Sequence, residues 1–238
     1  MDYLLLLSTI ALGAWTCHLL RRQGRAYVKV LNAFTGAYLL SLTFLHLLPE
    51  LYHNHGQPVH DQLTLGLLIL GGFFIQIVLD IFSMGIEHGH THHVHDRLPV
   101  GVLAGLCLHA LVEAMPLGNV QMHYDPASRR LLLWSIVLHN YPVSIALLGM
   151  LLHGGVRWGK ALGLLALFAS MAPLGMLLSG HTALAHHTRE LMAVAIGIFM
   201  HVSTTILFES GDVHRFNYGK TIAIVLGTGL GLLSVMLH

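Results

Sequence analysis

Residues 99–120 read PVGVLAGLCLHALVEAMPLGNV and contain one formally charged side chain, Glu113. An α-helix of about 20 apolar residues spans the hydrocarbon core of a bilayer. The stretch therefore predicts a transmembrane helix. Ionisable side chains inside such a helix are expensive, so His109 and Glu113 become candidates for a functional site.

Seven further stretches of the same character accompany it. The 238-residue chain is 55% hydrophobic and only 10% charged, whereas a soluble domain is about 25% charged. Residues 1–238 are expected to form a single all-α transmembrane domain with short connections and no soluble module. We read the first stretch as a retained helix rather than a signal peptide. The eight expected spans lie near 2–20, 29–52, 62–84, 99–120, 129–153, 158–179, 186–209 and 219–237.

The basic residues predict how the spans are oriented. Nine of the twelve lysines and arginines fall on one side of the arrangement, which the positive-inside rule assigns to the cytoplasm. Both termini are then outside, and residues 85–98 form a cytoplasmic loop. The nine residues are Arg21, Arg22, Arg25, Lys29, Arg97, Arg157, Lys160, Arg215 and Lys220.

The fourth and fifth spans carry the chemistry. His109 and Glu113 are four residues apart, so they share one helix face, and His139 lies at a similar depth in the next span. Two imidazoles and a carboxylate suit a borderline-soft divalent cation such as Zn²⁺. We predict a transport site from these three residues, with Asn140 as a candidate fourth ligand. The alternative is a buried hydrogen-bonded pair that only ties helices together.

Further histidines and acids extend the predicted pathway. His46 and Glu50 end the second span on the outer side and are candidates for its entrance. His201 and Glu209, in the seventh span, could line an exit or simply lie at the interface, and Asp80 has the same ambiguity. The cytoplasmic loop could hold metal weakly, as a reservoir on the release side. Its histidines are His88, His90, His92, His93 and His95.

Prolines and glycines say more about packing than about chemistry. Prolines that fall inside four of the spans predict bent inner helices, since each one frees a backbone carbonyl. Glycines in the third and eighth spans indicate close helix contacts. The residues are Pro49, Pro116, Pro142 and Pro173, with Gly66, Gly71, Gly72, Gly227, Gly229 and Gly231.

Several of these segments resemble the ZIP (Zrt/Irt-like protein) family of metal transporters. They are the FLHLLPE segment of residues 44–50, the HALVEAMPLG and HNYPVS segments that begin at His109 and His139, and the histidine-rich loop. The resemblance covers essentially the whole chain. It implies eight helices in an inverted 3+2+3 arrangement, and inward movement of Zn²⁺ or, in some members, of Fe²⁺, Mn²⁺ or Cd²⁺.

The chain also departs from the family's pattern at positions that hold ligands in some relatives. Ala110 stands where an Asn is common, Asn140 and Val143 stand where acids are typical, and Ala172 replaces a glutamate. Relatives with those ligands hold two adjacent ions. The resemblance therefore implies one ion in this chain, at the site of His109, Glu113 and His139.

The sequence thus predicts a zinc uptake transporter, not an enzyme, that works by alternating access. The short loops suggest that its membrane is a bacterial inner membrane. The expected partners are divalent ions, lipid and a second copy of the chain in a homodimer, with no catalytic cofactor. The near-neutral net charge of +1 argues against nucleic acid. Two alternatives stay open: a membrane-embedded metal-dependent hydrolase, and a metal sensor or scaffold without transport. An exporter of the cation-diffusion type is disfavoured, because that class resembles six helices with HxxxD pairs and a cytoplasmic metal domain, and this chain offers neither.

Overall fold

A computed structural model describes residues 1–19, 26–53, 59–83, 100–118, 126–208 and 218–237. Every regular element in these ranges is helical, and eight helical stretches are long and apolar enough to cross a membrane, as predicted. The α-helices are α1 (Asp2–Leu19), α2 (Ala26–Leu42), α3 (Leu48–Tyr52), α4 (Val59–Ser83), α5 (Val100–Ala114), α6 (Pro126–His153), α7 (Trp158–His181), α8 (Thr188–Phe208) and α9 (Tyr218–Met236). Three short segments adjoin them: the π-helix η1 (Thr43–Leu47) and the 3₁₀ segments η3 (Met115–Gly118) and η4 (Ala183–His187).

Each expected span overlaps one of these eight stretches. The second span is composite, because α2, η1 and α3 follow one another without a break from Tyr27 to Tyr52. The seventh span starts with η4 and continues as α8 to Phe208. Small shifts at the ends are expected, because helix termini are the least certain part of any hydropathy reading.

Two of the four prolines change the local helix geometry. Pro49 is the second residue of α3, which directly follows the π-helix η1, and Pro116 lies in the 3₁₀ turn η3 that ends the fourth span. Proline lacks an N–H and crowds the carbonyl four residues before it, so the backbone widens or tightens nearby. Pro142 and Pro173 instead lie inside the uninterrupted helices α6 and α7.

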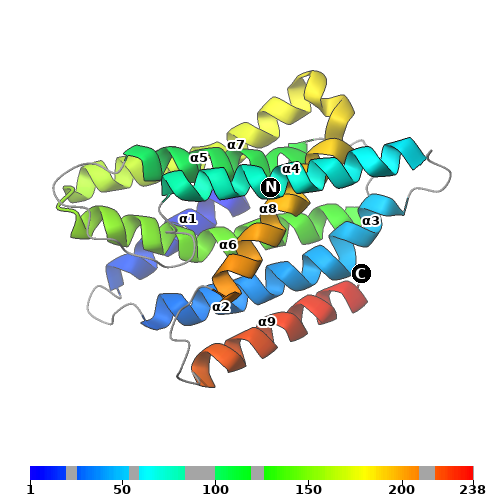
Figure 1. The fold of residues 1–238 in the computed structure, drawn as a ribbon. Coiled ribbons are helices and arrows are strands. Elements are labelled where there is room, and N and C mark those ends of the chain that lie inside the picture. The colour runs from blue at the N-terminus through cyan, green and yellow to red at the C-terminus, as the bar shows by residue number, and fades with distance from the viewer. Residues whose placement is uncertain (20–25, 54–58, 84–99, 119–125, 209–217, 238) are drawn as a thin grey trace.

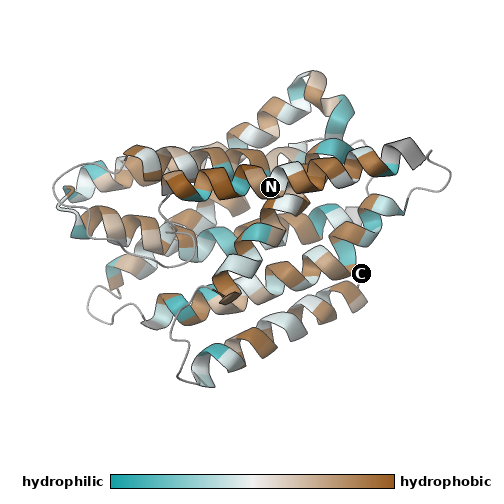
Figure 2. Ribbon diagram, in the orientation of Figure 1, coloured by the Kyte–Doolittle hydropathy of each residue, from teal (hydrophilic) through white to brown (hydrophobic). Residues whose placement is uncertain are grey.

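The helices pack side by side as an elongated bundle (Figure 1). The closest partnerships are α2 with α9, α4 with α8, α5 with α7, and α1 with α6. The most enclosed span belongs to α6, with 78% of its apolar window buried, whereas α9 has 17%. Figure 2 shows the front helix α4 hydrophobic over most of its length, as expected of a lipid-facing surface.

Glycines allow the α4–α8 contact. A Cβ on Gly72 would collide with the carbonyl oxygen of Val194, and a Cβ on Gly197 would collide with that of Ile69. The backbones of α4 and α8 therefore touch directly, as helices in membranes commonly do at small residues. Gly71 has open space at the same position, so only one of the two neighbouring glycines is required by packing.

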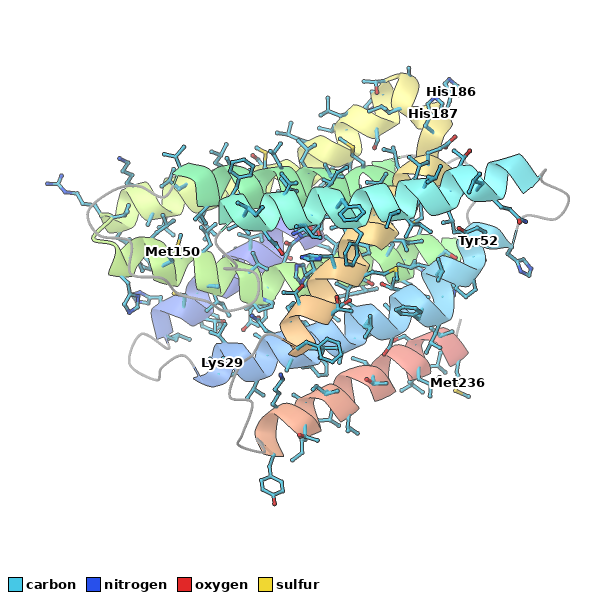
Figure 3. All side chains as sticks on the ribbon, in the orientation of Figure 1. Lys29, Tyr52, Met150, His186, His187 and Met236 are labelled. Atoms are coloured by element: carbon cyan, nitrogen blue, oxygen red, sulfur yellow. The ribbon has the colours of Figure 1, made fainter. Side chains whose placement is uncertain are left out.

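The span ends sort into two groups. Figure 3 shows Tyr52, His186, His187 and Met236 at one end of the bundle, and Lys29 and Met150 at the other. At the first end, Arg189 donates two hydrogen bonds to the carbonyl of Leu51, at 3.2 and 3.0 Å. The start of the second span and the end of the fifth therefore lie at one end of the bundle, opposite the end of the second span, the start of the seventh and the end of the eighth.

Candidate metal site

The site begins with two residues one turn apart on α5. His109 and Glu113 are fully buried, and Nε2 of His109 lies 3.1 Å from Oε2 of Glu113. The helix sets this proximity, because side chains four residues apart lie above one another on the same face. A carboxylate with no access to water needs compensation by a cation or by hydrogen bonds.

The third member comes from α6. His139 is 1% exposed, and its ring centroid lies 5.7 Å from that of His109, with 72° between the ring planes. One ligand atom from each of His109, Glu113 and His139 lies within 4.8 Å of the other two. Within the described residues, no other group of three His, Cys, Asp or Glu side chains converges in this way. The three predicted residues therefore come together, and their ability to bind an ion remains a prediction.

Asn140 completes the immediate surroundings of Glu113. Its Nδ2 donates a hydrogen bond of 2.9 Å to Oε1 of Glu113, which leaves Oε2 of that carboxylate on the side of His109. Oδ1 of Asn140 and Oε2 of Glu113 are both buried, and neither accepts a hydrogen bond from the described residues. Buried oxygens without donors are costly unless something else, such as a metal ion, contacts them.

Gln76 on α4 is a residue of the site that sequence reasoning missed. It is fully buried, and its Oε1 lies 2.8 Å from Nδ1 of His109. Gln76 in turn donates from Nε2 to Oδ1 of Asp80, at 3.0 Å. Gln76 and Asp80 are four residues apart in an apolar span, and this spacing is the signal that could have revealed them.

Asp80 and His201 form a second pair, which joins α4 to α8. Nε2 of His201 lies 2.6 Å from Oδ2 of Asp80, and both side chains are about one-seventh exposed, at 14% and 15%. The ring of His201 also meets Phe73 edge-on, with 5.0 Å between ring centroids. The predicted pathway residue His201 is thus tied to the ambiguous Asp80, which gives both residues a defined partner.

The electrostatics of the α5 pair call for a cation. If Nδ1 of His109 donates to Gln76, Nε2 carries either a lone pair or a second proton. A lone pair facing Oε2 of Glu113 at 3.1 Å would set two electron-rich atoms against each other. A proton or a metal ion between them removes that repulsion, and a metal ligand must be the unprotonated nitrogen.

Apolar side chains occupy three of the four positions at which the family resemblance implied lost ligands, and the fourth is Asn140. Ala110, Val143 and Ala172 are 1%, 2% and 5% exposed. None of them offers an oxygen or nitrogen in its side chain, so they add no ligands next to Glu113. One ion rather than two therefore remains the prediction for this donor set.

The other predicted pathway residues do not join this group. Nε2 of His46 lies 2.8 Å from Oγ of Ser128, and Glu50 is half-buried on α3. Within the described residues, neither belongs to a converging set of three ligands. Glu209 and the loop of residues 85–98 lie outside the described residues. That loop carries His88, His90, His92, His93 and His95.

Comparison with known proteins gives this geometry a family. A sequence profile described as ZIP Zinc transporter matches residues 98–237, which is more than half of the chain and includes His109, Glu113 and His139. A curated relative, "Zinc transporter ZIP9" of Micropogonias undulatus, is 26% identical over 202 residues, covering 74% of this chain and 64% of the relative. The chain thus spans just under two thirds of that relative's length. The chain belongs to the ZIP zinc transporter family.

Proposed function

We propose that this protein carries a divalent transition-metal ion across its membrane, and that Zn²⁺ is its principal substrate. The observation that carries the proposal is the meeting of two imidazoles and one carboxylate, all fully buried, inside two adjacent spans. Ionisable groups at that depth are rarely retained without a function.

The donor set favours zinc over harder ions. Zn²⁺ accepts nitrogen and oxygen ligands in a four-coordinate shell, which fits His109, His139 and Glu113 with one position left for water or for Oδ1 of Asn140. Mg²⁺ and Mn²⁺ prefer oxygen-rich, octahedral surroundings. We therefore expect transport of Zn²⁺ and Cd²⁺ to exceed that of Mn²⁺, with Fe²⁺ between them.

The charge of the site suits a carrier. One carboxylate compensates only half of the charge of a divalent ion, and the imidazoles must be neutral to bind it. Such a site holds the ion less firmly than one with several carboxylates. A transport site must bind strongly enough to capture its ion and weakly enough to release it.

The pathway is proposed in the inward direction. The ion enters near His46 and Glu50, binds at His109, Glu113 and His139, and leaves toward the cytoplasmic loop of residues 85–98. The movement is alternating access between helix groups in a 3+2+3 arrangement, and the partnerships α2–α9 and α4–α8 support it, since each joins one helix of the first three spans to one of the last three. The excess of basic residues on one side supports both termini outside, and the short connections support a bacterial inner membrane.

The family argues against the enzymatic and exporter alternatives. A metal-dependent hydrolase would need a carboxylate free to act as a base near metal-bound water. Glu113 is the one carboxylate in the converging group, and the proposal uses it as a ligand. Within the described residues, the site therefore has no second acid for that role.

The test is zinc influx into proteoliposomes that enclose a fluorescent zinc indicator. Wild-type protein should admit zinc faster than empty vesicles, and His109→Ala or His139→Ala should abolish most of the difference. His153→Ala is the matched control, because His153 is an exposed histidine on the same helix as His139. Influx no faster than in empty vesicles would overturn the transport proposal. Normal influx through both variants would overturn the site.

A further inference from the structure

Behind His109 lies a chain of hydrogen bonds that crosses three helices. It runs from His201 on α8 to Asp80 on α4, then to Gln76 on the same helix, and ends at Nδ1 of His109 on α5. The three contacts measure 2.6, 3.0 and 2.8 Å. Gln76 and His109 are completely buried, so no water competes for their contact.

The chemistry of Asp80 fixes the direction of every bond in this chain. An ionised carboxylate only accepts hydrogen bonds, so the amide of Gln76 must present its NH₂ group to Asp80. The amide oxygen of Gln76 then faces His109 and can only accept. Nδ1 of His109 must therefore carry the hydrogen, and Nε2 becomes the nitrogen available on the side of Glu113.

We propose that Gln76 is a positioning residue that holds His109 in the Nδ1–H form, and that Asp80, itself held by His201, keeps the amide of Gln76 turned the right way. The inference rests on the proposed metal site, for which His109 must offer Nε2. Behind many metal-binding histidines, a carboxylate or carbonyl accepts a hydrogen bond from the ring nitrogen that does not bind the metal. The proposal gives this role to the side chain of Gln76 on a neighbouring span.

Tautomer control matters because the wrong form cannot bind an ion in this place. A neutral histidine with its hydrogen on Nε2 has no lone pair on that atom, so the nitrogen that lies 3.1 Å from Oε2 of Glu113 could not bind an ion. Gln76 opposes that form, since its oxygen would then face a bare Nδ1 across 2.8 Å. The energetic preference thus comes from repulsion in the wrong form as well as from a bond in the right one.

A purely structural role for the chain makes a different prediction. If the bonds only tie α4 to α5 and α8, zinc affinity should follow the thermal stability of the variants. If Gln76 positions His109, affinity should follow the presence of an acceptor at position 76, whatever the stability does. Substitutions that keep or remove that acceptor separate the two.

The experiment measures the zinc Kd by competition with a chelating indicator, and the Tm, on the full-length protein in detergent. Gln76→Leu removes the acceptor at similar volume and should weaken zinc binding by about 10- to 100-fold. Gln62→Leu is the matched control, because Gln62 is exposed on the same helix. Gln76→Glu keeps an acceptor toward His109 but opposes Asp80, so it should lower the Tm while zinc binding stays near wild type or becomes tighter.

The double variant Gln76→Glu/Asp80→Asn restores the hydrogen-bond chain with its negative charge moved from position 80 to position 76. Asn at position 80 can donate to Glu at position 76, which still accepts from Nδ1 of His109, so zinc affinity and Tm should both return toward wild type. Unchanged affinity in Gln76→Leu would overturn the proposal, as would affinities that simply follow the Tm values.

A readout without metal keeps this inference separate from the proposed function. In metal-free protein carrying ¹⁵N-labelled histidine, the signals lost in His109→Ala identify that ring. At about pH 8, its Nδ1 should be protonated in wild type and lose that preference in Gln76→Leu. An unprotonated Nδ1 in wild type would overturn the inference even if zinc is transported, whereas a protonated Nδ1 in a protein that moves no zinc would overturn only the proposed function.

Discussion

Asn140 donates an N–H to Oε1 of Glu113 at 2.9 Å, from the position next to His139. The amide thereby ties α6 to α5 exactly where the candidate ligands of the two helices meet. It also selects which carboxylate oxygen faces His109, because the other oxygen is already engaged. Asn140 consequently acts on the site through Glu113, whether or not its own Oδ1 reaches the ion.

Removing this amide should loosen the carboxylate. Asn140→Leu has a similar volume but no donor, so Glu113 can rotate and its desolvation is no longer compensated at Oε1. We expect zinc binding to weaken by about 10- to 100-fold, the usual cost of losing an outer partner of a metal ligand. The zinc Kd of the purified protein measures this effect, and wild-type affinity in Asn140→Leu would contradict it.

The isosteric change Asn140→Asp is the charge control for that experiment. It replaces the donor by a second carboxylate beside Glu113, which only a cation or a proton can stabilise. Zinc should therefore bind more tightly, while turnover in proteoliposomes falls because release becomes slower. Faster turnover together with tighter binding would contradict this account.

The sequence predicts the fold well because one physical effect dominates it. Eight apolar stretches must become helices in a membrane, because a helix satisfies all of its backbone hydrogen-bonding groups within one segment. The α5 pair was also predictable, because helix geometry alone brings His109 and Glu113 together. His139 required only the further assumption that consecutive spans are neighbours.

The role of Gln76 could not be predicted in the same way. Which face of α4 meets α5 depends on how each helix is rotated about its axis, and hydropathy says little about that rotation. Direct backbone contacts at Gly72 and Gly197 fix the rotation of α4 against α8. The sequence alone cannot identify Gly72 as the contact residue, because the neighbouring Gly71 is an equally plausible candidate for that contact. The same contacts bring Asp80 to His201, which sequence reasoning had left unassigned.

The two adjacent glycines of α4 give a test of that packing. Gly72→Ala would place a methyl group against the carbonyl oxygen of Val194, whereas Gly71→Ala meets open space. We expect Gly72→Ala to destabilise the protein by about 1–3 kcal/mol, the usual cost of overpacking. Gly71→Ala should be neutral or slightly stabilising, because alanine favours helix over glycine.

Thermal unfolding in detergent measures both variants under the same conditions. A lower Tm for Gly72→Ala alone supports the direct contact between α4 and α8. Because the contact also sets the distance between Asp80 and His201, the same variant should weaken zinc binding more than Gly71→Ala does. Equal Tm values for the two variants would contradict the observed packing.

Arg129 supports a prediction about the end of the fourth span. Its Nε and Nη2 lie 3.3 and 3.0 Å from the carbonyl oxygen of Leu117, and Nη2 also lies 2.6 Å from Oδ2 of Asp2. Arg129→Lys keeps the charge but cannot supply two N–H groups in that fixed geometry. We expect a loss of about 1 kcal/mol and faster hydrogen exchange in η3.

Arg130→Lys is the control for that substitution, because Arg130 is the exposed neighbour of Arg129. It should leave both the Tm and the exchange rates unchanged. Hydrogen exchange followed by mass spectrometry on peptides that cover Met115–Gly118 makes the comparison directly. Slow exchange in both variants would show that other contacts hold the end of this span.

Protons and zinc should compete for the site. An imidazole binds a metal only when the nitrogen concerned is unprotonated, and histidine ordinarily titrates near pH 6.5. As the pH falls below about 6.5, the protonated population grows, so the zinc Kd should rise by up to about tenfold per pH unit for each ring involved. Binding should therefore be strongest above this range and fade below it.

The Kd is measured at each pH on protein in detergent, where no membrane separates two solutions, so a proton gradient cannot contribute. With His109 and His139 both acting as ligands, the plot of log Kd against pH should steepen toward a slope of about two on the acid side, whereas His139→Gln should bind more weakly with a slope nearer one. A Kd that stays flat between about pH 7.5 and 5.5 would contradict histidine ligation altogether.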